Sequence, residues 1–441
     1  MTRWSKTWAF AMLAAAPTPY ALAANIPPAF AYVPTSESLA KEVTPLLTME
    51  EAARLALIDQ PLLSGREATI EAEQQRAVAA AQLPDPKLSG GLKELPVDTP
   101  EAFSLRRDNF TEFTVGISQE FTRAEKRRLR GARESQGAEV ARSALDNDAR
   151  MVRRDTLLAW LDVYEAEQAY QLTQRLIDEG ALQVRALEKD YTAGKASQAD
   201  WLTAKVDFEL ISDKAHDWLH HALRARDGLA RWVGEAARQP LAEVPTLPAL
   251  AMTLPALVAR SEHHPVIGGL DQQINASTTD IALARQAYKP DVSVEFYFAY
   301  RPDFSDFVGV QFTIPLPYFT HNRQDRDLAA ARQQSRATEE RRRDALRELH
   351  TQVNQSYVDW QHFTQRVAEF DTAIVPDAEH RVDAARSAYA AGHGVFDAVL
   401  LARRSLLDVR LQRLSLFVES ARAQVRLEYL TAPKTPAGDS P

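Results

Sequence analysis

YTAGKASQADWLTAK, residues 191–205, returns later in the chain as YAAGHGVFDAVLLAR, residues 389–403. In register, the two copies share a tyrosine, an Ala-Gly pair, a leucine and a second alanine, and they end on Lys205 and Arg403. Each of these glycines stands between two long stretches of helix-forming residues. A glycine commonly ends a helix, and a second helix that starts a few residues later folds back on the first. Each copy therefore predicts the tip of a helical hairpin.

The residues on both sides of the tips follow one order twice, which predicts two internal repeats. In each repeat we expect two helices, two strands, a very long helix, the tip and a return helix. The first repeat covers residues 47–238, the second covers residues 253–432, and the proline-rich residues 239–252 link them. The expected strands lie at about 87–97, 111–121, 291–300 and 307–314, and the expected tips lie at 191–197 and 389–395.

The helices before the tips are unusually long. No proline occurs between Pro100 and Pro240, and residues 123–193 are mostly Ala, Glu, Arg, Leu and Gln, which favour helix. A continuous helix over this range would be about 105 Å long. Its apolar residues keep helical spacing among charged ones, as in a coiled-coil-like rod. The matching stretch of the second repeat, residues 323–390, contains Pro376, at which we expect the helix either to bend or to break.

The expected strands have one apolar and one polar face. In TEFTVGISQEF, residues 111–121, and in DVSVEFYFAY, residues 291–300, apolar and polar residues alternate. Four such strands cannot be stable as an open sheet, because both edges stay unpaired. An apolar outer face and a polar inner face suit a barrel in an outer membrane, and four strands per chain require an oligomer to close it. The sequence therefore predicts an α+β membrane protein.

Composition and charge exclude several classes of protein. The 441 residues carry a formal net charge of −8, which argues against a nucleic-acid partner. The chain has no cysteine, which excludes disulfides, thiolate metal sites and cysteine nucleophiles. The sequence shows no motif for a nucleophile, a catalytic metal or a cofactor, so we expect neither an enzyme nor a cofactor.

The N-terminal residues predict export. A basic start is followed by an apolar run and by Ala-Leu-Ala at residues 21–23, which fits the cleavage pattern of a secretory signal peptide at residues 1–23. We expect residues 24–46 to form an extended leader. We expect residues 433–441 to form a disordered tail.

His216 and His220 are the candidates for a metal site. They lie one helical turn apart on the expected return helix, a spacing that can hold Zn²⁺. No third ligand is evident, so a solvated helix face explains them better, and we predict no metal site. His263 and His264, which precede Pro265, are interpreted in the same way.

From about residue 47 to residue 430 the chain resembles the TolC-like outer-membrane efflux proteins. The resemblance rests on the paired tips with their Y-x-A-G and L-x-A-K/R elements, on the prolines before the first strand of each repeat, and on the V-G-I and V-G-V pieces of the strands. LPDPKLSGGL (83–92), VGISQEF (115–121) and IPLPYF (314–319) look most like the cation-efflux branch, which includes CzcC and CusC. Where that branch is expected to carry a Gly-Gly-Lys-Arg turn, this chain has Arg-Ala-Glu-Lys-Arg at residues 123–127.

The resemblance implies a homotrimer in the Gram-negative outer membrane. Three copies would form a twelve-stranded β-barrel there, and their long hairpins would form an α-barrel in the periplasm. Such a duct conducts substrate passively, docks by its tips to a periplasmic adaptor protein and receives cargo from an inner-membrane transporter of the RND type. The branch implies heavy-metal cations as cargo, with drugs or another exported substrate as the alternative. A periplasmic coiled-coil structural protein is a further alternative, against which the alternating strands argue.

The resemblance also assigns roles at the tips. Asp200 and Tyr389 are expected to form a hydrogen bond that holds the resting end shut. Where related proteins carry two pore-narrowing carboxylates, this chain has Ala398 and Leu401, with Asp397 beside them. The tips are expected to contact the adaptor, although the same residues could serve only to make the turns and pack the hairpins. The expected adaptor contacts are Gly194, Ala196, Leu202, Gly392, Val395 and Leu400.

Overall fold

The computed structural model describes residues 46–98, 100–243, 250, 252–394 and 396–431. The expected signal peptide, nearly all of the expected leader and the expected tail lie outside these residues. Most of the expected linker also lies outside them.

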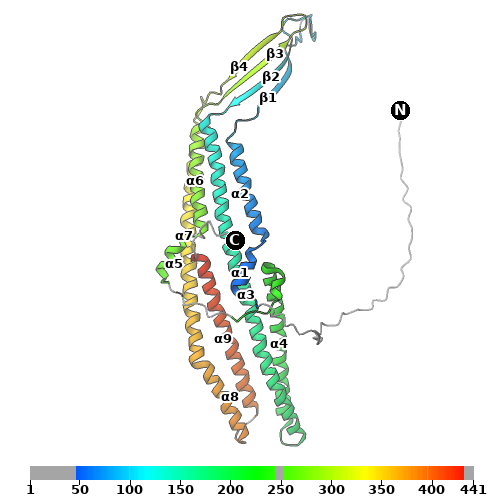
Figure 1. Cartoon of the computed structure of the whole chain (residues 1–441), viewed down its shortest axis with the longest axis vertical. Coiled ribbons are helices and arrows are strands. Elements are labelled where there is room, and N and C mark those ends of the chain that lie inside the picture. Colours follow the sequence, from blue (N-terminus) through cyan, green and yellow to red (C-terminus); the bar gives the residue numbers. More distant parts are fainter. Residues whose placement is uncertain (1–45, 99, 244–249, 251, 395, 432–441) are drawn as a thin grey trace, which may run out of the picture. The chain divides into compact units, whose positions relative to one another are not determined.

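Helices and strands follow one another in the same order twice (Figure 1). Two helices lead into two strands, a long helix follows, and after a short turn a last helix runs back beside it. In Figure 1 the sheet lies at one end of the helices, and both turns lie at the other end. The first succession consists of α1 (Met49–Leu57), α2 (Pro61–Ala80), β1 (Lys87–Lys93), β2 (Glu112–Phe121), α3 (Ala124–Thr192), α4 (Gln198–Val233) and the 3₁₀ turn η1 (Gly234–Arg238). The second consists of α5 (Leu254–Ser261), α6 (Pro265–Gln286), β3 (Val292–Tyr300), β4 (Phe307–Thr313), α7 (Gln324–Glu369), the π turn η2 (Phe370–Ile374), α8 (Val375–Ala390) and α9 (Phe396–Thr431).

The four strands form one antiparallel sheet in the order β1-β2-β3-β4. β2 and β3 pair across the two halves of the chain, with Val115 opposite Phe298 and Gly116 opposite Tyr297. β1 and β4 are the edge strands, so each has one side without a partner strand in the described part of the chain. An exposed strand edge is a template for pairing with another strand.

β1 is shorter than the expected range 87–97. It ends at Lys93, because Glu94 adopts a left-handed φ of 56° and Pro96 has no backbone N–H to donate to a neighbouring strand. The other three strands differ from their expected ranges by one residue at one end. Alternation located these strands well because it continues to their ends, whereas in β1 it is interrupted by Gly90 and Gly91.

Large apolar side chains share one face of the sheet, and they are exposed. Leu88, Ile117, Phe296 and Val310 lie side by side across the four strands, and Leu88 is 80% exposed. The opposite face carries polar and small residues and is better covered, since Thr114 is only 7% exposed. In a water-soluble protein, the apolar face of a sheet is buried and the polar face is exposed. This apolar face requires a nonaqueous cover.

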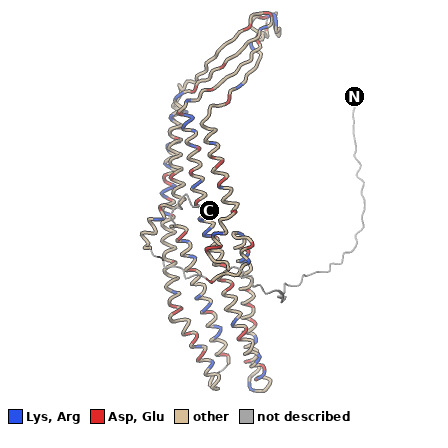
Figure 2. The backbone as a smooth tube through the Cα atoms, in the orientation of Figure 1, with Lys and Arg blue, Asp and Glu red and all other residues tan. Residues whose placement is uncertain are grey.

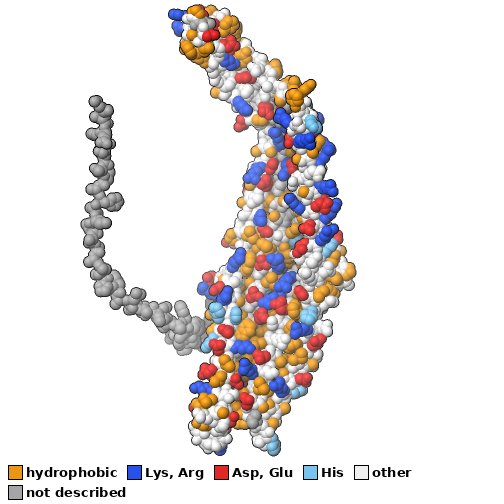
Figure 3. All heavy atoms as spheres, turned by 180° about the vertical axis from the view of Figure 1, so that it is seen from behind, with side chains coloured by type: hydrophobic (Ala, Val, Ile, Leu, Met, Phe, Trp, Pro, Cys, Tyr) orange, Lys and Arg blue, Asp and Glu red, His pale blue; other side chains and the backbone are white. Residues whose placement is uncertain are grey.

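Charged side chains are spread along the helices, whereas the strands carry few (Figure 2). Within the strands, Glu295 of β3 is the charged residue that lies away from the strand ends. Figure 3 shows acidic and basic side chains interspersed over the helical part of the face that it presents. No helix among the described residues is both long enough and apolar enough to cross a membrane.

α3 is the longest element of the molecule. Its 69 residues correspond to about 104 Å of helix. Next to the sheet, contacts order the helices as α2-α3-α6-α7, and toward the turns they order them as α4-α3-α9-α8. We call α3 with α4 the first hairpin, and α7 to α9 the second hairpin. Both were expected from the duplicated stretch.

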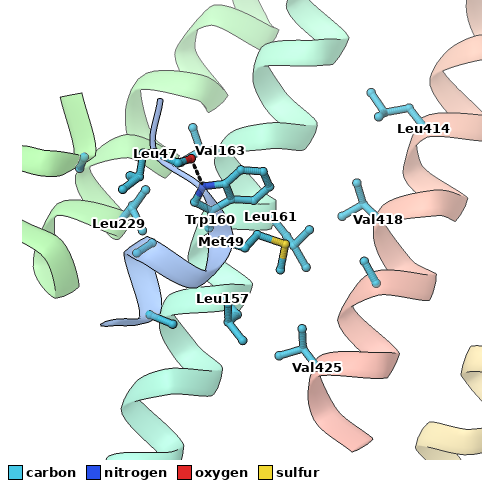
Figure 4. Packing of buried hydrophobic residues seen from close by; sticks show 14 of the residues in the cluster. Leu47, Met49, Leu157, Trp160, Leu161, Val163, Leu229, Leu414, Val418 and Val425 are labelled. Carbon is cyan, nitrogen blue, oxygen red and sulfur yellow. Dashed lines mark hydrogen bonds between the residues drawn. The ribbon is translucent and has the colours of Figure 1, made fainter. Parts of the chain in front are cut away.

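The largest buried core joins α1, α3, α4 and α9 at the middle of the helices (Figure 4). Trp160 of α3 is fully buried, and its Nε1–H donates to the Leu47 carbonyl at 3.0 Å. Leu47 also forms a β-bridge with Leu241, and Val418 of α9 packs on the same cluster. Full burial of one such aliphatic side chain contributes about 1.5–3 kcal/mol. This core fixes the two hairpins to each other well above their tips.

Pro376 does not break the second hairpin. α7 passes into η2, where the Val375 N–H bonds to the Phe370 carbonyl five residues earlier, and α8 has the proline in its first turn. The wider π turn accommodates a proline ring that would clash with a carbonyl in a regular helix. Arg413 of α9 holds this turn through hydrogen bonds of 2.8 and 2.9 Å to Asp371, which raise the pKa of Arg413.

Candidate docking and gating site at the hairpin tips

The first tip is a Schellman turn. Gly194 has a φ of 70° and its N–H bonds to the Tyr191 carbonyl at 3.0 Å, while the Lys195 N–H bonds to the Asp190 carbonyl at 2.7 Å. No atom lies within 4 Å of the position that a Gly194 Cβ would take. The glycine is therefore needed for its backbone conformation and not for space.

The second tip repeats these backbone hydrogen bonds. Gly392 has a φ of 74° and its N–H bonds to the Tyr389 carbonyl at 3.0 Å, while the His393 N–H bonds to the Ala388 carbonyl at 3.0 Å. The duplicated Y-x-A-G element thus specifies the same turn in both places. Val395, an expected adaptor contact, lies outside the described residues.

The two shared tyrosines have different aromatic partners. Tyr191 stacks on Trp201 of α4, with ring centroids 5.6 Å apart and planes 4° from parallel, and the Lys205 ammonium lies 5.7 Å from the Trp201 ring centre. Tyr389 meets Phe396 edge to face at 5.5 Å. The turns are alike in backbone, but they present different side-chain surfaces.

Asp200 closes a capping box at the start of α4. The Ser197 hydroxyl accepts from the Asp200 N–H at 3.1 Å, and the Asp200 carboxylate accepts from the Ser197 N–H at 3.3 Å. Tyr389 is 38% exposed and, within the described chain, makes no hydrogen bond to Asp200. The gating contact between these two residues stays a prediction. The geometry adds a second role for Asp200 as a helix cap, which its spacing from Ser197 could have revealed.

Leu202 and Leu400 are equivalent in the duplicated stretch but have different surroundings. Leu202 is 44% exposed. Leu400 is half-buried and lines a small cavity between the hairpins together with Leu176 of α3 and Phe208 of α4. Ala196 is half-buried, and its N–H donates to the backbone of the turn. Leu202 is thus exposed at the first tip, whereas Leu400 packs one hairpin on the other.

Ion pairs join the two hairpins near the tips. They connect α9 to α3 and to α4, and sequence spacing could not identify them because the partners lie on helices far apart in the chain. In the sequence, Arg403 is distinguished only as the like-charge match of Lys205. The pairs are Arg403 with Glu179 at 3.0 Å, Arg404 with Asp207 at 3.5 Å, and Lys214 with Asp408 at 2.8 Å.

Arg422 ties α9 to α3 closer to the core. Its guanidinium bonds to Asp162 at 2.5 Å and to Glu165 at 2.9 Å on α3, and to Glu419 of its own helix at 2.5 Å. Burial lowers the pKa of Arg422, but the charge of Glu165 and the hydrogen bond to Asp162 outweigh burial, so the pKa is raised. The guanidinium keeps its charge at every physiological pH.

His216 and His220, the metal candidates, are both exposed on α4. Among the residues that the structure describes, no group of three or more acidic or histidine side chains is placed to hold a metal ion. The geometry therefore brings no third ligand to the histidine pair.

His264 differs from the expected solvated helix end. It is 1% exposed, its Nδ1 accepts from the Val266 N–H at 3.4 Å at the start of α6, and its ring meets Tyr429 edge to face at 5.1 Å. Burial, followed by the charge of the Arg150 guanidinium, lowers the pKa of His264 to about 4. The interpretation as a solvated residue was wrong because α9 covers this helix end, and no local pattern reports that packing.

Comparisons with known proteins agree with this geometry. Residues 261–432 match the family model described as outer membrane efflux protein. No curated protein matches the chain in sequence. Among solved structures, the chain is similar to the CmeC outer membrane channel of Campylobacter jejuni, with 12% identity, a TM-score of 0.73 and coverage of 87% of this chain and 85% of that one.

Two further structures are similar to the same degree. VceC of Vibrio cholerae shares 16% identity at a TM-score of 0.73, covering 88% of this chain and 97% of that one. CusC shares 15% identity at a TM-score of 0.72, covering 91% and 97%. At such identities the likeness establishes the fold. It does not distinguish the cation-efflux branch from the others.

The structural matches cover more of the chain than the family model does. The model matches α6 to α9 with the second tip, and the structural matches extend over the first hairpin as well. Residues 261–432 thus match the outer membrane efflux protein family, and most of the chain has the fold of outer membrane channels.

Proposed function

We propose that this protein is the passive exit duct of a tripartite efflux pump. One observation carries the proposal: a sheet with an exposed apolar face and a shielded polar face continues into helices of about 100 Å, which end in two exposed turns. The apolar face suits lipid and the polar face suits a water-filled lumen. The turns are then the periplasmic end, where an adaptor protein connects the duct to an inner-membrane transporter.

Three copies would close the duct. β1 and β4 are edge strands, so β4 of one copy can pair with β1 of the next to give a barrel of twelve strands. The helices next to the sheet can join in the same way. α2 and α7 are the two end helices of the row α2-α3-α6-α7, so α7 of one copy can pack against α2 of the next. An oligomer of this kind leaves no strand edge unpaired.

Extraction and reconstitution test the duct. The protein should leave the outer membrane only with detergent, migrate as a heat-modifiable trimer, and give discrete conductance steps in a planar bilayer. A monomer that stays soluble without detergent and conducts nothing would instead identify a periplasmic rod.

The tips are proposed to dock the adaptor. Because the chain has no cysteine, a single introduced cysteine is a unique attachment point. Leu202→Cys at the first tip should cross-link to the adaptor, whereas Val78→Cys on α2, which is 63% exposed and far from the tips, should not. Equal cross-linking from both positions would contradict docking through the tips.

Heavy-metal cations are the proposed cargo, with drugs as the alternative. The support is the resemblance of the strand and turn sequences to the cation-efflux branch. A passive duct needs no fixed metal ligands, since cargo choice lies with the transporter that feeds it. Deletion of the gene should sensitise cells to metals such as zinc, copper or cadmium. Sensitivity to drugs alone would assign the duct to a drug pump.

A further inference from the structure

Two glycines lie on the polar face of the sheet, one on each side of Tyr297. Gly116 of β2 and Gly309 of β4 are its cross-strand neighbours, and each belongs to a V-G-I or V-G-V piece. Cross-strand neighbours share a face, so a side chain at either glycine would point to the same side as Tyr297. We call this row across the sheet, Gly116-Tyr297-Gly309, the glycine layer. In this layer, β2 and β4 place no side chain on the polar face.

The Tyr297 ring lies down over Gly309. A Cβ added at Gly309 would stand 2.4 Å from Tyr297 Cζ and 2.5 Å from its hydroxyl oxygen, so no side chain fits while the ring lies there. The Lys93 ammonium is 5.1 Å from the centre of the same ring. The tyrosine thus lies along the sheet and does not project from it.

Ser89 and Glu295 meet across Gly116. The Ser89 hydroxyl donates to Glu295 Oε1 at 2.8 Å. A Cβ added at Gly116 would stand 2.8 Å from that carboxylate oxygen and 2.9 Å from Ser89 Oγ. The absence of a side chain at Gly116 therefore lets Glu295 also lie flat along the sheet. Glu295 is the one charged side chain in the middle of the described strands.

We propose that Gly116 and Gly309 set the width of the outer-membrane pore, because they keep the polar side chains of this layer flat against its wall. The inference rests on the proposed function, in which the polar face lines the lumen of an oligomer. Each copy contributes the same layer, so a side chain lifted off the wall would enter the lumen from every copy at one depth. The room above these glycines then sets the free cross-section of the outer-membrane part of the duct, in series with the proposed closure at the tips.

Conductance of the reconstituted duct and the entry of neutral polymers of graded size test the inference, with the polymers added on the outer-membrane side so that they reach this layer without passing the tips. Gly309→Ala pushes the Tyr297 ring into the lumen, so conductance should fall and smaller polymers should be excluded. Adding Tyr297→Ser to that variant should restore the wild-type values, because the displaced ring is gone. Gly91→Ala is the matched control: it lies on the same face of β1, and the nearest atom to its added Cβ is 4.0 Å away, so conductance should not change.

Several results would overturn the inference. One is wild-type conductance in assembled Gly309→Ala, and another is an equal loss in the double variant. If Gly309→Ala does not assemble, the single variant Tyr297→Ser tests the inference instead, because it adds no atoms. Removal of a flat ring should leave conductance near the wild-type value, and a large rise would mean that the ring projects. A wild-type protein without any conductance would refute the proposed function itself, which is a different outcome.

Discussion

At the scale of single residues, the tip glycines act through backbone conformation. Gly194→Ala places a side chain in the left-handed region and should lower the free energy of unfolding by about 1 kcal/mol. Gly228→Ala is the matched control, because it lies inside α4 with no atom within 4 Å of its added Cβ, and it should raise stability by about 0.5–1 kcal/mol. Thermal unfolding in detergent measures both. Shifts of the same sign would contradict this assignment.

Asp200 has two candidate roles, and two variants separate them. Ser197→Ala and Asp200→Ala both break the capping box, but only the second removes the carboxylate proposed to hold the tips shut. Asp200→Ala should therefore raise single-channel conductance, and Ser197→Ala should not. Tyr389→Phe keeps the ring on Phe396 and should act like Asp200→Ala. If conductance in Asp200→Ala and Ser197→Ala is the same, Asp200 serves only as a cap.

His264 should make stability depend on pH. Its pKa is lowered from 6.5 to about 4 in the folded chain, so between these values the unfolded chain binds more protons. The contribution of neutral His264 to the free energy of unfolding is complete above pH 6.5 and is lost as the pH falls toward 4. His264→Asn retains a capping acceptor and should flatten this part of the stability profile. The exposed neighbour supplies the control, since His263→Asn should leave the profile unchanged.

At the scale of elements, Arg422 fastens α9 to α3. Arg422→Gln leaves Asp162, Glu165 and Glu419 without their shared cation and should destabilise the protein by about 1–3 kcal/mol. Arg426→Gln, an exposed position on the same helix, should change stability little. Urea unfolding in detergent compares the two. Equal destabilisation by the two variants would mean that the three ion pairs of Arg422 stabilise the protein no more than the exposed Arg426 does.

The elements themselves were largely predictable. Helix-forming composition located α3 to within one residue at each end, and alternation located β2 and β3, because both signals come from neighbouring positions in the chain. Local patterns could not choose between a bend and a break at Pro376. The outcome depended on η2, which Arg413 holds from another helix.

At the scale of the whole molecule, the two faces of the sheet should respond oppositely to charge. Val310→Arg places a cation on the exposed apolar face, where a lipid contact would cost about 2–4 kcal/mol. Gln311→Arg, the next residue on the same strand, points to the polar face and should be tolerated. The yield of heat-modifiable trimer in the outer membrane measures the difference. Equal yields would mean that the apolar face does not meet lipid.

The sequence by itself determined the turns, the helices and the amphipathic strands, and hence the order of elements in the fold. Each of these depends on residue types only a few positions apart. Tertiary structure alone decided that Arg404 reaches Asp207, that His264 is buried, and that Tyr297 lies over Gly309. These contacts join distant parts of the chain, and their existence depends on how helices and strands pack in register. No local pattern encodes that register.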